Sequence, residues 1–247
     1  MKALSLITAL GLALASLAAQ AVGQRADITI FDRATHRELP VYWHDGRAYV
    51  VGRPGNEYQV IVKNRIGEDL LAVVSVDGLN VMNGEAANPR QAGYIVSPWA
   101  RMDIAGWRKS MEEVAAFYFT ELGDSYAGRT GRPENVGVIG VALFQRKPAP
   151  PPYRERSESS RDSTNEARAQ NKTLQAPAAN APLGTGHGRR EESRVQWQQF
   201  ERSTETPVET IAIYYDSYRN LVAQGVLQQP VARRDPNPFP TAFTPDP

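Results

Sequence analysis

The sequence predicts an all-β fold for residues 25–147, an antiparallel β-sandwich of jelly-roll or immunoglobulin-like type or a small barrel. Short runs of β-branched and aromatic residues support this prediction, because such residues suit pleated strands. Gly, Asp and Asn interrupt the runs at intervals typical of turns between strands. The chain of 247 residues contains no cysteine, so burial of the core has to stabilise the fold without disulfides.

The first strands surround a hairpin turn. Residues 27–31 form a short β-branched run, and residues 39–44 and 47–51 flank the dipeptide Asp45-Gly46. Because Asp-Gly tolerates the positive φ angles of a type I′ turn, we expect a two-residue hairpin here.

The next strands differ in their patterns. Residues 58–64 alternate, as expected of a strand with one face in water, whereas residues 70–76 are continuously apolar, as expected of a strand covered on both faces. The segment 108–114 competes as a helix but is short and polar. Further strands are predicted at 93–96, 102–104, 114–120 and 136–144.

The composition changes at Pro148. Residues 148–192 begin with a proline-rich run and contain few large apolar side chains, so we expect a long disordered linker. Residues 193–227 contain alternating runs at 195–200 and 209–215, followed by helical spacing from 216 to a terminating Gly225. A strand-plus-helix element of this size is not stable alone, so we expect it to dock on the β domain. Residues 228–247 are predicted to form a disordered, proline-rich tail.

The N-terminus has the pattern of a secretory signal peptide. Lys2 precedes an apolar run from 3 to 18, and small residues at 19–21 fit a cleavage site. The run is too short to span a bilayer, and without cysteine the chain cannot be a lipoprotein. Cleavage after Ala21 leaves 27 basic and 27 acidic residues, a balance that disfavours nucleic-acid binding. We therefore expect a periplasmic or secreted protein of a Gram-negative envelope, with no membrane span after cleavage.

The segment Gly184-Thr-Gly-His-Gly188 is the most conspicuous motif. Its G-x-G-x-G spacing differs from that of dinucleotide-binding loops, and Arg189 and Arg190 follow it instead of a helix. The glycine amides and these arginines could bind a phosphate or carboxylate. The alternative is a flexible hinge at the end of the linker.

Metal and nucleophile patterns are weak. The three histidines, His36, His44 and His187, lack zinc-site spacing, and no serine lies in a G-x-S-x-G motif. Hard oxygen donors suited to calcium cluster in one loop, where the alternative interpretation is an Asp-Gly turn. These donors are Asp77, Asn80, Asn83 and Glu85.

Two tryptophans and two arginines are further candidates for binding. Trp99 and Trp107 could stack on a sugar or a peptide, or could instead close the end of the sandwich. Arg129 and Arg132 could pair with an anionic ligand, or could belong to a solvated loop.

Several segments resemble a family of uncharacterised exported proteobacterial proteins, and the resemblance omits only the linker. It implies a Gram-negative envelope location and assigns no activity, ligand or catalytic residue. The matching segments are 56–64, 71–81, 104–108, 115–119, 125–133, 135–141, 184–188 and 213–222.

No strong catalytic pattern is present, so the sequence favours a binding or envelope-structural role, with an envelope protein or glycan as partner. No catalytic residue, cofactor or metal is predicted. The alternative is a hydrolase of envelope polysaccharide or peptidoglycan that would use carboxylates between Asp77 and Glu85, or Asp103.

Overall fold

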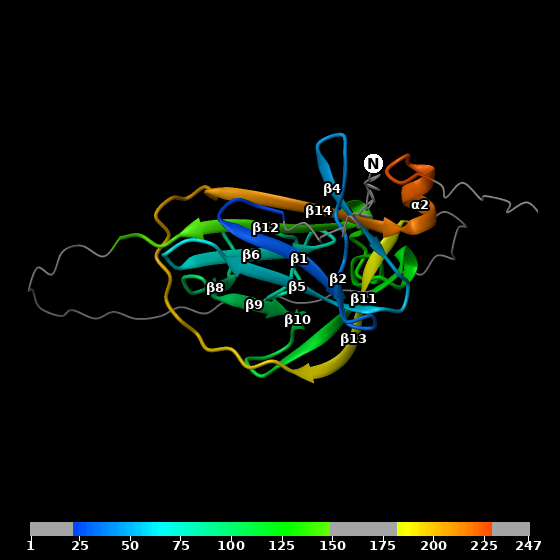
Figure 1. Ribbon diagram of the computed structural model, residues 1–247. Helices are drawn as coiled ribbons and strands as arrows, with labels where there is room; N and C mark the ends of the chain where they lie inside the picture. The colour runs from blue at the N-terminus through cyan, green and yellow to red at the C-terminus, as the bar shows by residue number, and fades with distance from the viewer. Residues whose placement is uncertain (1–21, 149–181, 229–247) are drawn as a thin grey trace, which may run out of the picture.

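The structure, a computed structural model, describes residues 22–148 and 182–228. The predicted signal peptide, most of the predicted linker and nearly all of the predicted tail lie outside these residues. Figure 1 shows strands packed in two layers, and the all-β sandwich prediction is confirmed. Within the described ranges, no helix is long and apolar enough to cross a membrane.

Sheet A contains seven strands in the order β10-β11-β5-β1-β2, with β13 pairing with β11 and β9 pairing with β5. All these pairings are antiparallel. The strands are β1 (Ala26–Asp32), β2 (Arg37–Glu38), β5 (Glu57–Asn64), β9 (Arg101–Ile104), β10 (Gly106–Arg108), β11 (Glu113–Glu121) and β13 (Leu183–Glu192).

Sheet B also contains seven strands, in the order β3-β4-β14-β12-β6-β7, with β8 pairing with β6. Two short helices, α1 (Tyr126–Arg129) and α2 (Tyr218–Ala223), and two 3-10 turns, Leu122–Asp124 and Pro133–Asn135, complete the described elements. The strands are β3 (Tyr42–His44), β4 (Arg47–Gly52), β6 (Leu70–Val76), β7 (Leu79–Asn80), β8 (Tyr94–Val96), β12 (Val138–Gln145) and β14 (Glu209–Ser217).

The predicted hairpin and the predicted strands of residues 25–147 are confirmed. Asp45 and Gly46 have φ angles of 48° and 72° between β3 and β4, as a type I′ turn requires. Strand β6 is buried on both faces, as its continuous apolar run indicates. The competing helix at 108–114 does not form, because this segment is the end of β10, a turn and the start of β11.

The main core lies between the two sheets. Alternate residues of each strand point inward, so that Ile28 and Val60 of sheet A are buried in the same cluster as Val74 and Ile213 of sheet B. A second, smaller cluster lies on the outer side of sheet B, where Phe200 packs on residues of β6 and β12. The segment after β13 therefore contributes to the core.

The C-terminal element docks as predicted and does so in the middle of a sheet. Strand β14 lies between β4, to which it is parallel, and β12, to which it is antiparallel. Helix α2 follows, with the Ser217 side chain accepting a hydrogen bond from the Asn220 amide, and Gly225 comes after it with a φ of 77°. The two described segments thus form one fold.

Two predictions for this half of the chain are wrong. Residues 183–192, assigned to the disordered linker, form β13, because β11 offers a partner strand along almost their whole length. Residues 195–200, predicted as a strand, have no regular secondary structure and belong to no sheet. An alternating pattern cannot reveal whether a partner strand is present.

Candidate functional site

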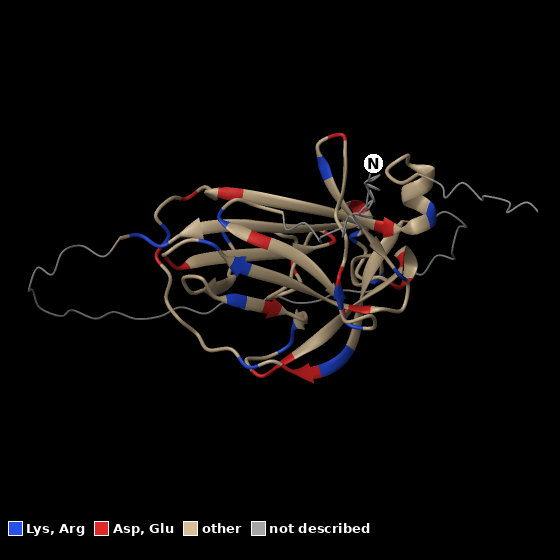
Figure 2. Cartoon of the chain, in the orientation of Figure 1, with Lys and Arg blue, Asp and Glu red and all other residues tan. Residues whose placement is uncertain are grey.

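Residues 193–202, which we call the strap, connect β13 of sheet A to the approach to β14 of sheet B. The strap has no regular secondary structure, apart from one isolated bridge between Arg202 and Arg146. In Figure 1 the gold chain that leaves β13 runs around one side of the sandwich, away from the labelled strands, before it reaches β14. Figure 2 shows its middle without charged residues. The contacts that hold the two ends of the strap define the site between the strap and the sandwich.

The N-terminal end of the strap is held by β10 and by the turn that follows. The amides of Ser193 and Val195 donate to the carbonyl oxygens of Glu112 (2.7 Å) and Met111 (2.9 Å). The Arg108 guanidinium donates to the Ser193 carbonyl and, over 3.0 Å, to the Ser193 hydroxyl. These contacts fix the end of the strap to sheet A.

The C-terminal end is held by both loops and strands. Arg202 donates to the carbonyl oxygens of Pro89 (3.0 Å) and Gln91 (2.7 Å), and its guanidinium lies 4.2 Å from the centre of the Phe144 ring. Arg146 donates to the Gln199 carbonyl over 3.1 Å. This end is therefore fixed to sheet B and to the loop before β8.

The middle of the strap is free of such contacts. Gln196, Trp197 and Gln198 are exposed, and the Trp197 side chain is 77% exposed, the largest value among the exposed large apolar residues. No hydrogen bond joins these three residues to any other described residue. The strap is thus fastened at two ends and unsupported between them.

A groove of about 840 Å³ lies between the strap and the body of the sandwich. Its floor comes from β8, β9 and the loop before β8, the side on which both sheets have an open edge. Small-molecule sites in proteins typically measure ~300–1,000 Å³. The volume is therefore within the range of small-molecule sites.

The apolar wall of the groove is unusually rich in methionine. Met82, Met102 and Met111 all line it, and the only other methionine of the sequence is Met1. Methionine side chains are unbranched and adapt to irregular apolar ligands. Leu71, Ile95 and Phe200 extend the apolar surface toward the C-terminal end of the strap. The wall suits an elongated apolar group.

The charges of the groove are mostly positive. Arg90, Arg108, Arg194 and Arg202 line it, whereas Asp103 is the one carboxylate that the described residues contribute. Asp103 is paired with Arg101 at 2.6 Å, outside the lining. The groove therefore presents more cationic than anionic charge.

The loop proposed for calcium does not assemble a site. Asp77 is buried, Asn80 is buried and donates to the Ala92 carbonyl, and Asn83 pairs with Glu85 at the surface. No group of three or more His, Asp or Glu side chains suited to a metal ion occurs among the residues that the structure describes. The alternative, an Asp-Gly turn, is what forms, since Asp77 and Gly78 have φ angles of 52° and 73°.

Asp77 instead ends a buried chain of hydroxyl groups. Its carboxylate accepts from Tyr215, from the Thr185 amide (2.7 Å) and from the Gly137 amide (3.0 Å). Thr185 lies 2.6 Å from both tyrosine hydroxyls, those of Tyr58 and Tyr215. Because Tyr215 donates its one proton to Asp77, Thr185 must donate to Tyr215 and Tyr58 to Thr185. The network links both sheets at β13.

Burial controls ionisation in this network. It raises the pKa of Asp77 to about 6, although the three hydrogen bonds oppose the rise. Burial first, and the nearby Asp77 charge second, raise the pKa of Tyr58 and Tyr215 well above the ordinary phenol value, which keeps both donors protonated.

The glycine motif is part of β13. Gly184, Gly186 and Gly188 are spaced by two and lie on one face of the strand, where a Cβ on Gly186 would come within 2.2 Å of the Tyr118 ring. Thr185 between them faces the core. The flexible-hinge interpretation is wrong, and the anion-binding one finds no open loop here.

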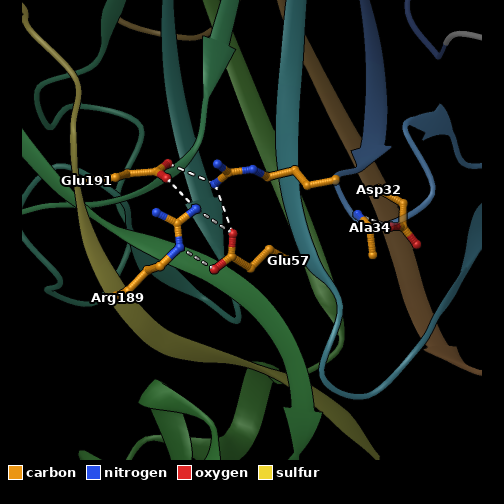
Figure 3. A network of polar contacts seen from close by, with 6 residues as sticks. Asp32, Ala34, Glu57, Arg189 and Glu191 are labelled. Carbon is orange, nitrogen blue, oxygen red and sulfur yellow. Dashed lines mark hydrogen bonds and ion pairs between the residues drawn. The ribbon is translucent and has the colours of Figure 1, made fainter.

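The arginines after this motif are engaged in ion pairs. Figure 3 shows Arg189 between Glu57 and Glu191, and Arg33 completes the network. Arg189 contacts Glu57 at 2.8 Å, and Arg33 contacts Glu191 at 2.9 Å. The network attaches the outer end of β13 to β5.

The histidines and tryptophans singled out from the sequence do not come together in one site. His36 and His44 lie at turns, whereas His187 packs beside Tyr126, and burial and nearby cations lower its pKa. Trp107 is 3% exposed and belongs to the main core cluster, so it is not available to stack on a sugar or a peptide. Trp99 is 67% exposed but does not line the groove.

Sequence reasoning missed the groove residues Arg108, Arg202 and the three methionines. The one available signal was the confinement of internal methionine to positions 82–111. Comparisons with protein-family models, with curated proteins and with solved structures found no match.

Proposed function

We propose that this chain is an exported binding protein whose ligand occupies the groove beneath the strap. The observation that supports this most is the strap itself, fixed at both ends over a groove of about 840 Å³ and unsupported between them. A segment of this kind can shift to admit a ligand without breaking a strand pairing. The predicted signal peptide supports placing this activity in the envelope.

The geometry gives the hydrolase alternative no support. Glycosidic hydrolysis by side chains ordinarily needs two carboxyl groups flanking the scissile bond. Asp77 is buried in the hydroxyl network. Asp103, the one carboxylate of the groove among residues 22–148 and 182–228, is paired with Arg101. The candidate carboxylates therefore do not form a pair in the groove.

The proposal is tested with the neutral fluorescent probe N-phenyl-1-naphthylamine, which brightens in apolar sites. We expect saturable binding to the wild-type protein and about tenfold weaker binding to Met102→Trp, because the larger side chain fills part of the groove. The matched control is Ala212→Trp, which adds the same indole at an exposed position of β14 outside the groove and is expected to bind as wild type does. Absence of saturable binding, or equal affinity for Met102→Trp, would contradict the proposal.

A further inference from the structure

Two arginines of the groove lack a carboxylate partner. Among the described residues, no carboxylate oxygen lies within 4.0 Å of Arg108 or Arg202, whereas Arg90 is paired with Glu205 and Arg194 with Glu192. Arg108 and Arg202 contact carbonyl and hydroxyl oxygens, which are neutral. Their formal charges are therefore uncompensated inside a partly enclosed groove, and such charges favour an anion.

The two arginines differ in what they can still bind. Arg108 directs all three of its guanidinium nitrogens at Tyr94, Ser110 and Ser193. Arg202 uses one N–H toward Pro89 and one toward Gln91, which leaves three of the five guanidinium donors without a partner in the described chain. Arg202, unlike Arg108, therefore has N–H donors available for a ligand.

Arg202 also lies between two cavities. It lines the groove and a second cavity of about 740 Å³, together with Arg90 and Phe200. The acidic residues of that second cavity are already paired, Glu201 with Lys147 and Glu205 with Arg90. Partial burial lowers the pKa of Arg202 from its ordinary value. A bound anion would restore the solvation that burial removes.

We propose that the groove binds an elongated amphiphile with one anionic head group, a carboxylate or a phosphate, and that Arg202 binds this head group. The apolar chain would lie against the wall that contains Met82, Met102 and Met111. The proposal rests on the proposed function, because it names the ligand class for the same groove. A forked guanidinium matches the two oxygens of either head group.

The test is calorimetric titration with dodecanoate, dodecyl phosphate, dodecyl maltoside and dodecyltrimethylammonium, each below its micelle concentration, and with inorganic phosphate. We expect both anionic amphiphiles to bind at least about tenfold more tightly than the neutral and cationic ones, and inorganic phosphate to bind more weakly than dodecyl phosphate. Arg202→Gln is expected to remove the preference for anions, and Arg202→Lys, which keeps the charge, is expected to retain most of it.

The control is Arg53→Gln, an exposed arginine outside both cavities, which is expected to keep wild-type preference. Equal binding of anionic and neutral amphiphiles would overturn the inference and leave the proposed function standing. If inorganic phosphate binds as tightly as dodecyl phosphate, the inference that the ligand is an amphiphile is wrong, and the site binds a free anion. Failure of every dodecyl compound to bind would count against both proposals.

Discussion

Asp77 is the residue at which the early and late parts of the chain meet. Its carboxylate accepts from Gly137, Thr185 and Tyr215, which come from three different strands or their approaches. A buried carboxylate that is charged costs stability, and the three donors offset only part of this cost, because its pKa remains raised to about 6.

The first prediction concerns pH. The pKa of Asp77 is higher in the folded state than its ordinary value of 3.8, so the folded protein binds the proton more tightly. The free energy of unfolding should therefore increase as the pH falls from about 6 to about 4, with a contribution of about 2 kcal/mol from this residue over that interval. Urea unfolding at pH 7, 6, 5 and 4 measures it.

Asp77→Asn removes the titration and should lose this increase. It is also expected to be less stable at every pH, because the Gly137 and Thr185 amides donate to different carboxylate oxygens and the amide nitrogen that replaces one of these oxygens cannot accept a hydrogen bond. The control is Asp124→Asn, an exposed carboxylate outside the network, which should follow the wild-type curve. An Asp77→Asn curve parallel to wild type between pH 6 and 4 would show that Asp77 does not titrate there.

Single residues are predicted well where local geometry decides their role and poorly where distant partners do. Asp45-Gly46 and Gly225 act within a few residues of the chain, and both are confirmed. The sequence identifies Asp77 as a turn residue, but its donor Tyr215 is 138 positions away. Nothing local in a sequence specifies such a partner.

Strand β13 is the element that was hardest to predict from the sequence. Its glycines, spaced by two, lack the side chains that normally reveal a strand, and Arg189, Arg190, Glu191 and Glu192 resemble a solvated linker. In the structure the missing side chains make room for Tyr118 and Ser125, which approach where Cβ atoms would lie. The spacing itself, which is the period of a strand, was the usable signal.

The second prediction follows from this packing. Gly186→Ala should lower the free energy of unfolding by about 1–3 kcal/mol, because the new methyl group overlaps the Tyr118 ring. Denaturant unfolding measures the change. Gly67→Ala is the control, since no atom of the described chain lies within 4 Å of the place that its added methyl group would take, and we expect little effect.

A double-mutant cycle distinguishes the cause. In a Tyr118→Ala background, Gly186→Ala should cost clearly less, because the overlapping ring is absent. An unchanged cost in that background would mean that Gly186 is needed for another reason, such as its backbone conformation.

The strap is the opposite case to β13, because its sequence predicts a strand that does not form. Its alternation of Val195 and Trp197 predicts a strand, yet no backbone hydrogen bond joins its middle to another described segment. Whether an alternating segment becomes a strand depends on the available edges of a sheet, which the rest of the fold determines. The groove exists because this segment is left unpaired, and local patterns could not predict it.

At the scale of the whole molecule, two segments separated by the predicted linker build one sandwich. The β-class and the docking of the C-terminal element follow from apolar periodicity, because each run needs a partner surface. The insertion of β14 between β4 and β12 does not follow, because many edges could accept one more strand. Composition therefore predicted the architecture but not the strand order.

The third prediction uses this arrangement. A protease site engineered within residues 149–181 should allow complete cleavage while both fragments stay together in gel filtration, because β13 and β14 each pair along most of their length. Separation should require denaturant, and the cleaved protein should unfold at lower urea when diluted. Fragments that separate in buffer would contradict the single-fold description.

Because β14 lies in the middle of sheet B, this sheet cannot be completed until β14 has been made. Strands β4 and β12 each keep an open edge until Glu209–Ser217 has been made, long after β4 and β12 themselves. Contacts between such distant segments form slowly, and open edges are sites of aggregation. A chain interrupted before residue 217 would therefore be left with a gap in sheet B, so the fold of the described residues is completed only when β14 is present.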